Sequence, residues 1–244
     1  MLYLVSLGLH DEKDISLRGI EALKKSDKVF METYTSSIKP DMSSLEALIW
    51  RKIIVVDRRA VEEECVILES AKNCNTAFIV PGDALSATTH QQIVFEARKL
   101  GIPVEVIHGS SIFSAVAETG LSLYKFGMTV SLPKPQEHYF PMSPYENIFE
   151  NKKRGLHTLI LLDIGMNAKE AVEILLELEK KAGKNLFSDS TKLVVVAHLG
   201  QNSAIKYGTI TDLKKEELYN LPHTLILPGD LHFSENEFLS QFKI

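Results

Sequence analysis

Residues 77–85 have the sequence AFIVPGDAL, an unbroken apolar run that stops at Pro81 and is followed by Gly82 and Asp83. Such a run is typical of a strand buried on both faces, as in a parallel sheet covered by helices. Proline ends the strand because it cannot donate to the ladder, and glycine removes the side chain where a ligand would approach. Asp83 then places a hydrogen-bond acceptor at the carboxyl edge of the sheet, where parallel sheets bind ligands.

Short apolar and β-branched runs recur along the first half of the chain. They predict strands at residues 2–7, 28–31, 53–56, 77–80 and 104–107. Helical patterns lie between them: one follows Ser16, and another follows Thr89 and ends at Gly101. Strands that alternate with amphipathic helices indicate a parallel sheet. We therefore expect an α/β domain of three layers, with helices on both faces of the sheet.

The second half of the chain has a different pattern of predicted strands and helices. Strands are predicted at residues 159–163, 193–197, 207–210 and 224–227. A long helix separates the first two, with Asn167 and Glu170 forming a capping box at its start and Gly183 at its end. Because this half has fewer helices per strand than the first, we expect a mixed sheet.

The change in the pattern of strands and helices between the two halves predicts two α/β domains. A helix that begins near Ser111 ends by Gly120, and after residue 127 comes an apolar run followed by a proline-rich stretch. We assign residues 1–110 to an N-terminal parallel-sheet domain and residues 111–244 to a C-terminal mixed-sheet domain.

Three of the predicted N-terminal strands end in turns that suit ligand contact, at residues 6–9, 81–85 and 108–115. All three carry glycine, and the third also has two serines and offers free backbone N–H groups where a strand leads into a helix. Because the carboxyl ends of parallel strands share one edge, the turns should converge on one crevice. Each also has an ordinary explanation: the first can be a plain turn, and Asp83 and the serines of the third can be helix caps.

Composition bounds the partners. With 27 basic and 32 acidic residues the net charge is −5, which argues against nucleic acid as a direct partner. The two cysteines have no zinc or redox spacing, the N-terminus lacks the features of a signal peptide, and the apolar runs are too short to cross a bilayer. We expect a soluble cytoplasmic protein without a membrane partner.

Several chemistries are disfavoured by spacing. A dinucleotide fingerprint needs three closely spaced glycines, and the glycine after Gly8 is Gly19. The eight histidines show no helical i, i+4 pair, so no metal is expected. The segment after Gly82 lacks the flanking glycines of a nucleophile elbow, which disfavours serine hydrolase chemistry.

Several segments together resemble the diphthine synthase family, which belongs to the tetrapyrrole-methylase-like class of S-adenosylmethionine-dependent methyltransferases. They are LGLHDEKDIS (7–16), ETYTS (32–36), PGDALSATTH (81–90), SSIFSAVAETGLSLYKFG (110–127), RGLHTLILLDI (154–164) and PGDLH (228–232). The glycine–aspartate turn is common to the class, whereas ETYTS, the ATTH extension, YKFG and RGLHTL are typical of this family. The resemblance implies two α/β domains with the cofactor in the cleft between them, and a homodimer.

The resemblance also implies which residues bind S-adenosylmethionine, and after transfer S-adenosylhomocysteine. They are Leu9, Asp83, Ser86, Ser111, Ile112, Leu162, Leu199 and His223. Two positions depart from the family pattern: Ser6 stands where the family usually has glycine, and Ala84 where it usually has proline.

The implied substrate is the modified histidine of translation elongation factor 2, methylated on the amino nitrogen of its 3-amino-3-carboxypropyl arm. The sequence leaves the number of methyl groups open, although the absence of a long C-terminal extension resembles archaeal members, where three are expected. No catalytic residue is assigned. Asp163 and Glu118 are candidate carboxylates for the amine, each with a structural alternative. The substrate contacts are expected among the residues of ETYTS: Glu32, Tyr34, Thr35 and Ser36.

Two other functions stay open from the sequence. One is a methyltransferase of a corrin or porphyrin precursor, which would share the class and its glycine–aspartate turn. The other is a binding or regulatory module that keeps the crevice without catalysis. Cofactor binding without methyl transfer would favour the second.

Overall fold

The computed structural model describes residues 1–38, 40–217 and 221–244. The chain forms two compact units, Met1–Ala115 and Val116–Ile244, and each is described by itself. Ser111 and Ile112 lie in the first unit.

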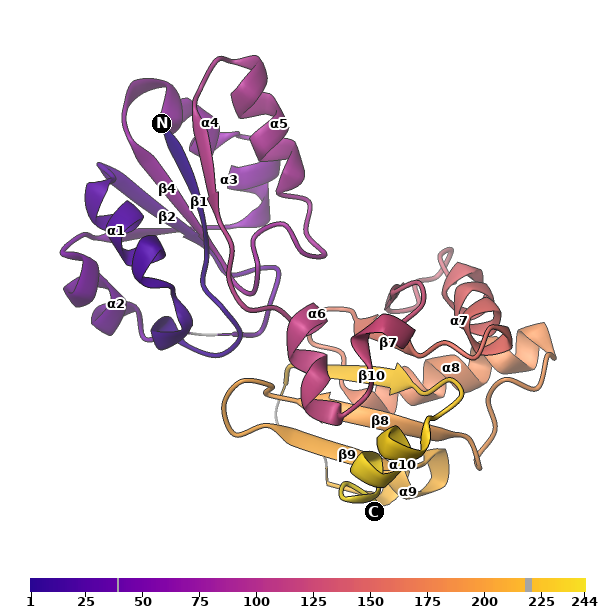
Figure 1. The fold of residues 1–244 in the computed structure, drawn as a ribbon. Coiled ribbons are helices and arrows are strands. Elements are labelled where there is room, and N and C mark those ends of the chain that lie inside the picture. The colour runs from indigo at the N-terminus through magenta and orange to yellow at the C-terminus, as the bar shows by residue number, and fades with distance from the viewer. Residues whose placement is uncertain (39, 218–220) are drawn as a thin grey trace. The chain divides into compact units, whose positions relative to one another are not determined.

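The first unit is built on a five-stranded parallel sheet (Figure 1). Its strands are β1 (Leu2–Ser6), β2 (Lys28–Glu32), β3 (Ile53–Val56), β4 (Thr76–Val80) and β5 (Val104–Ile107). They follow the order β3-β2-β4-β1-β5, so β1 lies between β4 and β5. The five strands expected from the sequence are confirmed, with ends that differ by a residue at most.

Helices cover both faces of this sheet. On one face α1 (Leu17–Lys25) and α2 (Met42–Ile49) pack on Val5 and Ile79. On the other, α3 (Arg58–Glu62), α4 (Val66–Asn73) and α5 (Gln91–Lys99) pack on Leu4 and Phe78. Because successive strand side chains point to opposite faces, a continuously apolar strand feeds both cores. The three-layer α/β fold is confirmed.

The second unit contains a mixed sheet. Its strands are β6 (Val130–Leu132), β7 (Thr158–Leu162), β8 (Lys192–Ala197), β9 (Ala204–Thr209) and β10 (His223–Leu227). The order is β6-β7-β10-β8-β9, with β6 and β7 parallel and β10 antiparallel to both β7 and β8. The expected mixed sheet is confirmed.

Helices α7 (Ser143–Lys153), α8 (Ala168–Ala182) and α9 (Ile210–Lys215) supply the core on one face of the second sheet. The predicted capping box is present at the start of α8, and Gly183 ends it in the left-handed conformation. The strand expected at 207–210 is displaced: β9 ends at Thr209, whose side chain caps α9, so Ile210 is helical. A further helix, α10 (Phe233–Ser240), lies near the C-terminus.

In the parts of the chain that the structure describes, no helix has the length and apolar character needed to cross a bilayer.

Candidate functional site

The turns that follow β1, β4 and β5 meet at the carboxyl edge of the first sheet. The backbone of Gly8 pairs with that of Gly82, with N–H to carbonyl distances of 3.1 and 2.8 Å. Both glycines have positive φ, 100° and 69°, which side chains rarely adopt. A Cβ added to Gly109 would lie 3.6 Å from the Gly8 nitrogen, so the third turn abuts the first. The predicted convergence of the three turns is confirmed.

Asp83 joins the second turn to the third. One carboxylate oxygen accepts from His108 Nδ1 at 2.8 Å and Gly109 N at 3.1 Å, and the other accepts from Leu85 N and Ser86 Oγ. Burial by itself would raise the pKa of Asp83, but these four donors together hold that pKa below its ordinary value. Asp83 is therefore an ionised carboxylate at the edge of the sheet. It does not cap a helix, because α5 begins later, at Gln91.

The two departures from the family pattern form one contact. Ser6 Oγ accepts a hydrogen bond from the buried Ala84 N at 3.0 Å. A proline at 84 would have no N–H to satisfy, and a glycine at 6 would have no hydroxyl to offer. A Cβ on Gly109 would come within 2.8 Å of the Ser6 Cβ, so the serine also requires glycine at 109. The serine thus supplies the hydrogen bond that an alanine at 84 requires.

The other predicted residues of the first unit lie at the same edge. Leu9 is half-buried, and its N–H donates to Asp14 Oδ2 at 3.0 Å. The carbonyl of Ser111 accepts from Ser114 N and Ala115 N and so starts the short helix α6 (Ile112–Ala115). Leu9, Asp83, Ser86, Ser111 and Ile112 therefore lie on turns that are packed together at the strand ends.

The three predicted residues of the second unit also share an edge. Strand register pairs His223 with Ala197 and Thr224 with Leu161, so Leu162 and Leu199 lie near the end of β10 that begins at His223. His223 is buried, and its Nδ1 accepts from Ala168 N at 3.1 Å.

Asp163 and Glu118 serve backbone contacts in the second unit. Asp163 accepts from Ile164 N at 2.9 Å and Lys134 N at 3.2 Å, on opposite carboxylate oxygens. Glu118 accepts from Gly200 N at 3.1 Å and so holds the loop that carries Leu199. Both carboxylates are thus tied to loops at the strand ends.

The ETYTS segment follows β2, the neighbour of β4. Glu32 is fully buried, and its carboxylate accepts from Tyr34 N at 2.7 Å, Thr35 N at 3.0 Å and the Thr35 hydroxyl. It therefore shapes the loop that carries the half-buried Tyr34, Thr35 and Ser36. The Tyr34 hydroxyl lies 3.3 Å from Nε2 of His90, the last residue of the ATTH extension. Two segments that resemble the same family thus meet through their side chains.

A second set of family-like segments meets inside the second unit. Buried His157 pairs through Nε2 with Glu235 Oε1 at 3.1 Å and accepts at Nδ1 from Gly229 N at 2.9 Å. Lys125 binds the other oxygen of Glu235 at 2.6 Å. Because Nδ1 accepts, the proton of the neutral imidazole is on Nε2. The YKFG, RGLHTL and PGDLH segments are therefore held together by a buried network, which the sequence did not reveal.

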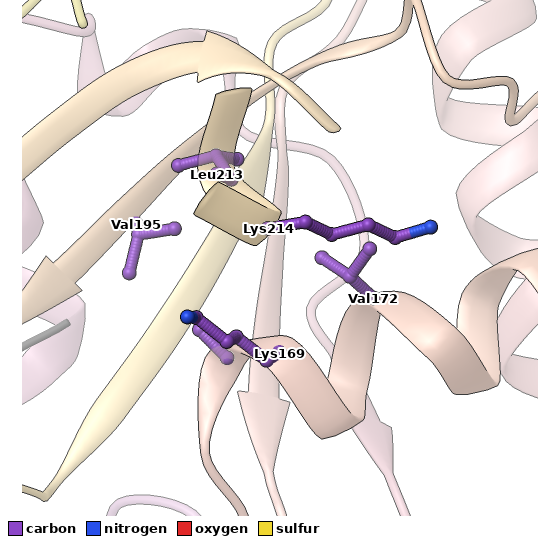
Figure 2. A pocket seen from close by; sticks show the side chains of 6 residues that line it. Lys169, Val172, Val195, Leu213 and Lys214 are labelled. Carbon is purple, nitrogen blue, oxygen red and sulfur yellow. The ribbon is translucent and has the colours of Figure 1, made fainter. Parts of the chain in front are cut away.

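A separate hollow in the second unit has an empty volume of about 170 Å³, open solvent included, so it is a shallow depression and not an enclosed cavity. Lys169 and Lys214 extend past its apolar side chains (Figure 2). Its lining residues are Ala168, Lys169, Val172, Val195, Leu213 and Lys214, and none of them is a predicted site residue.

Cys65 and Cys74 are free thiols. Among the residues that the structure describes, no group of three or more histidine, cysteine, aspartate or glutamate side chains is arranged to hold a metal ion.

Comparison with known proteins assigns the family. Residues 1–214 match the model of the tetrapyrrole (corrin/porphyrin) methylases. A diphthine synthase of Methanococcus maripaludis is 42% identical over 98% of this chain and 97% of its own. The chain belongs to the diphthine synthase family of tetrapyrrole methylases.

Two further relatives agree with this assignment. A diphthine methyl ester synthase of Schizosaccharomyces pombe is 38% identical, covering 100% of this chain and 95% of its own. A crystal structure from Entamoeba histolytica, assigned as a diphthine synthase, superposes with a TM-score of 0.93 at 38% identity over 100% of this chain and 98% of the other. As a member of the diphthine synthase family, the protein is a methyltransferase.

Proposed function

We propose that this protein transfers methyl groups from S-adenosylmethionine to translation elongation factor 2. The acceptor is the amino nitrogen of the 3-amino-3-carboxypropyl arm on its modified histidine. The observation that carries the proposal is the ionised Asp83, which ties two of three converging strand-end turns together. A fixed negative charge suits a cationic sulfonium donor and disfavours the phosphates of a nucleotide.

The strand-end turns fit such a donor. A Cβ added to Gly82 would meet nothing within 4 Å, so the backbone is open there for close approach. We assign donor contacts to Leu9, Asp83, Ser86, Ser111 and Ile112 in the first unit and to Leu162, Leu199 and His223 in the second. When bound, the donor supplies an electrophilic methyl group.

The chain's own contribution is mainly alignment. Fixing the reacting groups in line supplies up to about 7–11 kcal/mol without any covalent intermediate. The amine must lose its proton before it attacks. Because the pKa of such an amine is about 8, deprotonation at one pH unit below that pKa costs only about 1.4 kcal/mol. No strong general base is required. We place Tyr34, Thr35 and Ser36 on the substrate side, with Glu32 holding their loop in shape.

We further propose that the protein acts in the cytoplasm as a homodimer.

The number of methyl groups that the protein transfers can be read from the product of the reaction. Three on nitrogen give diphthine, whereas the name of the Schizosaccharomyces pombe relative includes a methyl ester. An ester requires a further transfer to the carboxylate of the arm, so product mass and alkali lability of the last methyl distinguish the two outcomes.

The test uses labelled S-adenosylmethionine and an elongation factor 2 that carries the unmethylated arm, followed by mass measurement of that histidine. We expect label on the arm, and we expect Asp83→Asn to lower kcat/KM for the donor by about 100-fold or more because a charge and a turn-bridging acceptor change together. The matched control is Asp27→Asn, whose carboxylate binds Asn75 N at the opposite end of the strands. It should leave transfer unchanged.

Circular dichroism shows whether both aspartate variants stay folded. Donor binding without transfer to the factor would favour a binding module or another acceptor, and the absence of both would contradict the proposal.

A further inference from the structure

Tyr34 and His90 form a side-chain pair, and their surroundings decide which of the two donates the hydrogen bond. His90 is 1% exposed, and its Nε2 lies 3.3 Å from the Tyr34 hydroxyl. The other ring nitrogen, Nδ1, is buried and has no hydrogen-bond partner of ordinary geometry among the described residues. Unpaired buried nitrogens are uncommon and require an explanation.

The pair is fastened to the turn that carries Asp83. Thr88 Oγ1 donates to the Ala84 carbonyl at 2.9 Å and accepts from His90 N at 3.3 Å. The Phe78 ring packs edge-on against the imidazole, with 5.3 Å between ring centroids. His90 is thus held in one place beside the expected donor turn, and Tyr34 with it.

The imidazole is neutral at pH 7. Burial lowers the pKa of His90 below its ordinary value, although the carboxylates of Glu32 and Glu62 act to raise it. The phenol of Tyr34 is neutral too, because burial raises its pKa and the negative charge of Glu32 raises that pKa further. Arg58, which lies 5.3 Å from the Tyr34 ring, and Asp57 are the other charges that face the pair.

A neutral imidazole carries one N–H, and its surroundings decide where. The backbone carbonyl of Ala84 also acts on the imidazole as a hydrogen-bond acceptor, which works to raise its pKa. A carbonyl can only accept a hydrogen bond. Since Nε2 faces the Tyr34 hydroxyl, Nδ1 is the nitrogen left to carry the proton. Nε2 is then an acceptor, and the Tyr34 O–H must donate to it.

We propose that neutral His90 holds the Tyr34 hydroxyl proton inward, so that the phenolic oxygen presents its lone pairs to an N–H of the substrate amine and aims the nitrogen lone pair at the methyl donor. This deepens the proposed function and rests on it. His90 acts through Tyr34 and is a positioning residue. Once protonated, His90 donates from Nε2, the Tyr34 proton turns outward, and the hydroxyl competes for the lone pair that must attack.

This mechanism has a kinetic signature. The amine itself must be deprotonated, so log kcat/KM for the protein substrate falls with a slope of about 1 below the amine pKa. Protonation of His90 adds a second loss, and the slope approaches 2 below the pKa of that imidazole. A merely structural histidine would not change the slope while the protein stays folded.

The experiment compares wild type with His90→Gln, His90→Phe and Tyr34→Phe over pH 5–9. Glutamine keeps an acceptor near the Nε2 position but does not titrate. We expect H90Q to stay within about 10-fold of wild type with a slope of 1 throughout, and H90F and Y34F to lose more than about 10-fold in kcat. His138→Gln, on an exposed loop, is the matched control and should behave as wild type.

Nitrogen-15 NMR of the protein without substrate provides a readout that does not depend on activity, and should show His90 protonated at Nδ1 alone near pH 7. Protonation at Nε2, or an H90F variant as active as wild type with an unchanged profile, would overturn the inference alone. A wild-type protein that transfers no methyl group would overturn the proposed function as well.

Discussion

The two buried histidines of family-like segments, His90 and His157, differ in how completely their nitrogens are paired. His157 has both nitrogens engaged, by Glu235 and Gly229. His90 pairs through Nε2, while its buried Nδ1 is left without a partner of ordinary geometry. Completed pairing indicates a side chain that stabilises the fold, and incomplete pairing beside the strand ends where we propose that the donor binds indicates one retained for another reason. A resemblance in sequence cannot make that distinction.

Matched His→Phe substitutions give the largest expected contrast. His157→Phe should lower the free energy of unfolding by about 3–5 kcal/mol, because it leaves the Gly229 N–H unpaired and removes a partner from a buried charge network. His90→Phe should change it by no more than about 1 kcal/mol, since it replaces a half-satisfied ring by an apolar one.

Urea unfolding followed by far-ultraviolet circular dichroism measures both values. The single tryptophan, Trp50, lies in the first unit and is a poor reporter of the second, so hydrogen exchange of β10 and α10 should supplement it. If both substitutions lowered the free energy of unfolding equally, the proposed difference between His157 and His90 would be contradicted.

Acid should unfold the His157 network in two steps. Burial would raise the pKa of Glu235, but Lys125, the N–H groups of His232 and Ser122, and His157 lower it from 4.5 to about 2. The unfolded chain therefore binds this proton first, and Glu235 contributes about 3 kcal/mol that is present above about pH 5 and lost as pH falls toward 2. Burial also lowers the pKa of His157 from 6.5, so the stability that the neutral imidazole contributes is lost as pH falls below about 6.5.

Unfolding free energies between pH 7 and 3 measure this dependence. Glu235→Gln should be less stable at neutral pH and should lose less stability in acid than wild type. Glu237→Gln, on the exposed side of the same helix, should follow the wild-type curve. If E235Q lost stability in acid as steeply as wild type, the assigned role of Glu235 would be contradicted.

The smallest expected effect concerns the Ser6–Ala84 contact, which supports the edge where His90 is held. Ser6→Gly should cost about 1–3 kcal/mol because the buried Ala84 N–H loses its acceptor. Adding Ala84→Pro removes that N–H, so the double variant should recover part of the loss. A double-mutant cycle in urea measures the coupling, and additive effects would show that the two positions are independent.

The strands, the capping box of α8 and the three strand-end turns were predictable because each is encoded locally, by an apolar run, a cap or a glycine. Helix α4 was not predicted, and its N-cap, Cys65, makes no side-chain cap. Helix α10 was not predicted either; its N-cap is His232, a residue type that rarely caps. Local patterns were thus sufficient for the two sheets and for α1, α5 and α8, whereas the short helices α2 and α3 were missed although Asp41 and Asp57 cap them.

Part of the site was predictable for the same reason. Asp83 was identified as an acceptor at a strand end, but its partners His108 and Gly109 come from a different strand end. Tyr34 and His90 are separated by 56 residues, and His157 and Glu235 by 78. Contacts of this kind depend on tertiary packing and leave no periodic trace in the sequence.

The central claim is that the strand-end turns of the first unit hold the methyl donor. Its most direct test is a crystal structure of the protein soaked with S-adenosylhomocysteine. The account predicts the ligand against Leu9, Asp83 and Ser111, with Asp83 still bridging its two turns. A ligand bound elsewhere, such as in the hollow between Lys169 and Lys214, with those turns left empty, would contradict it.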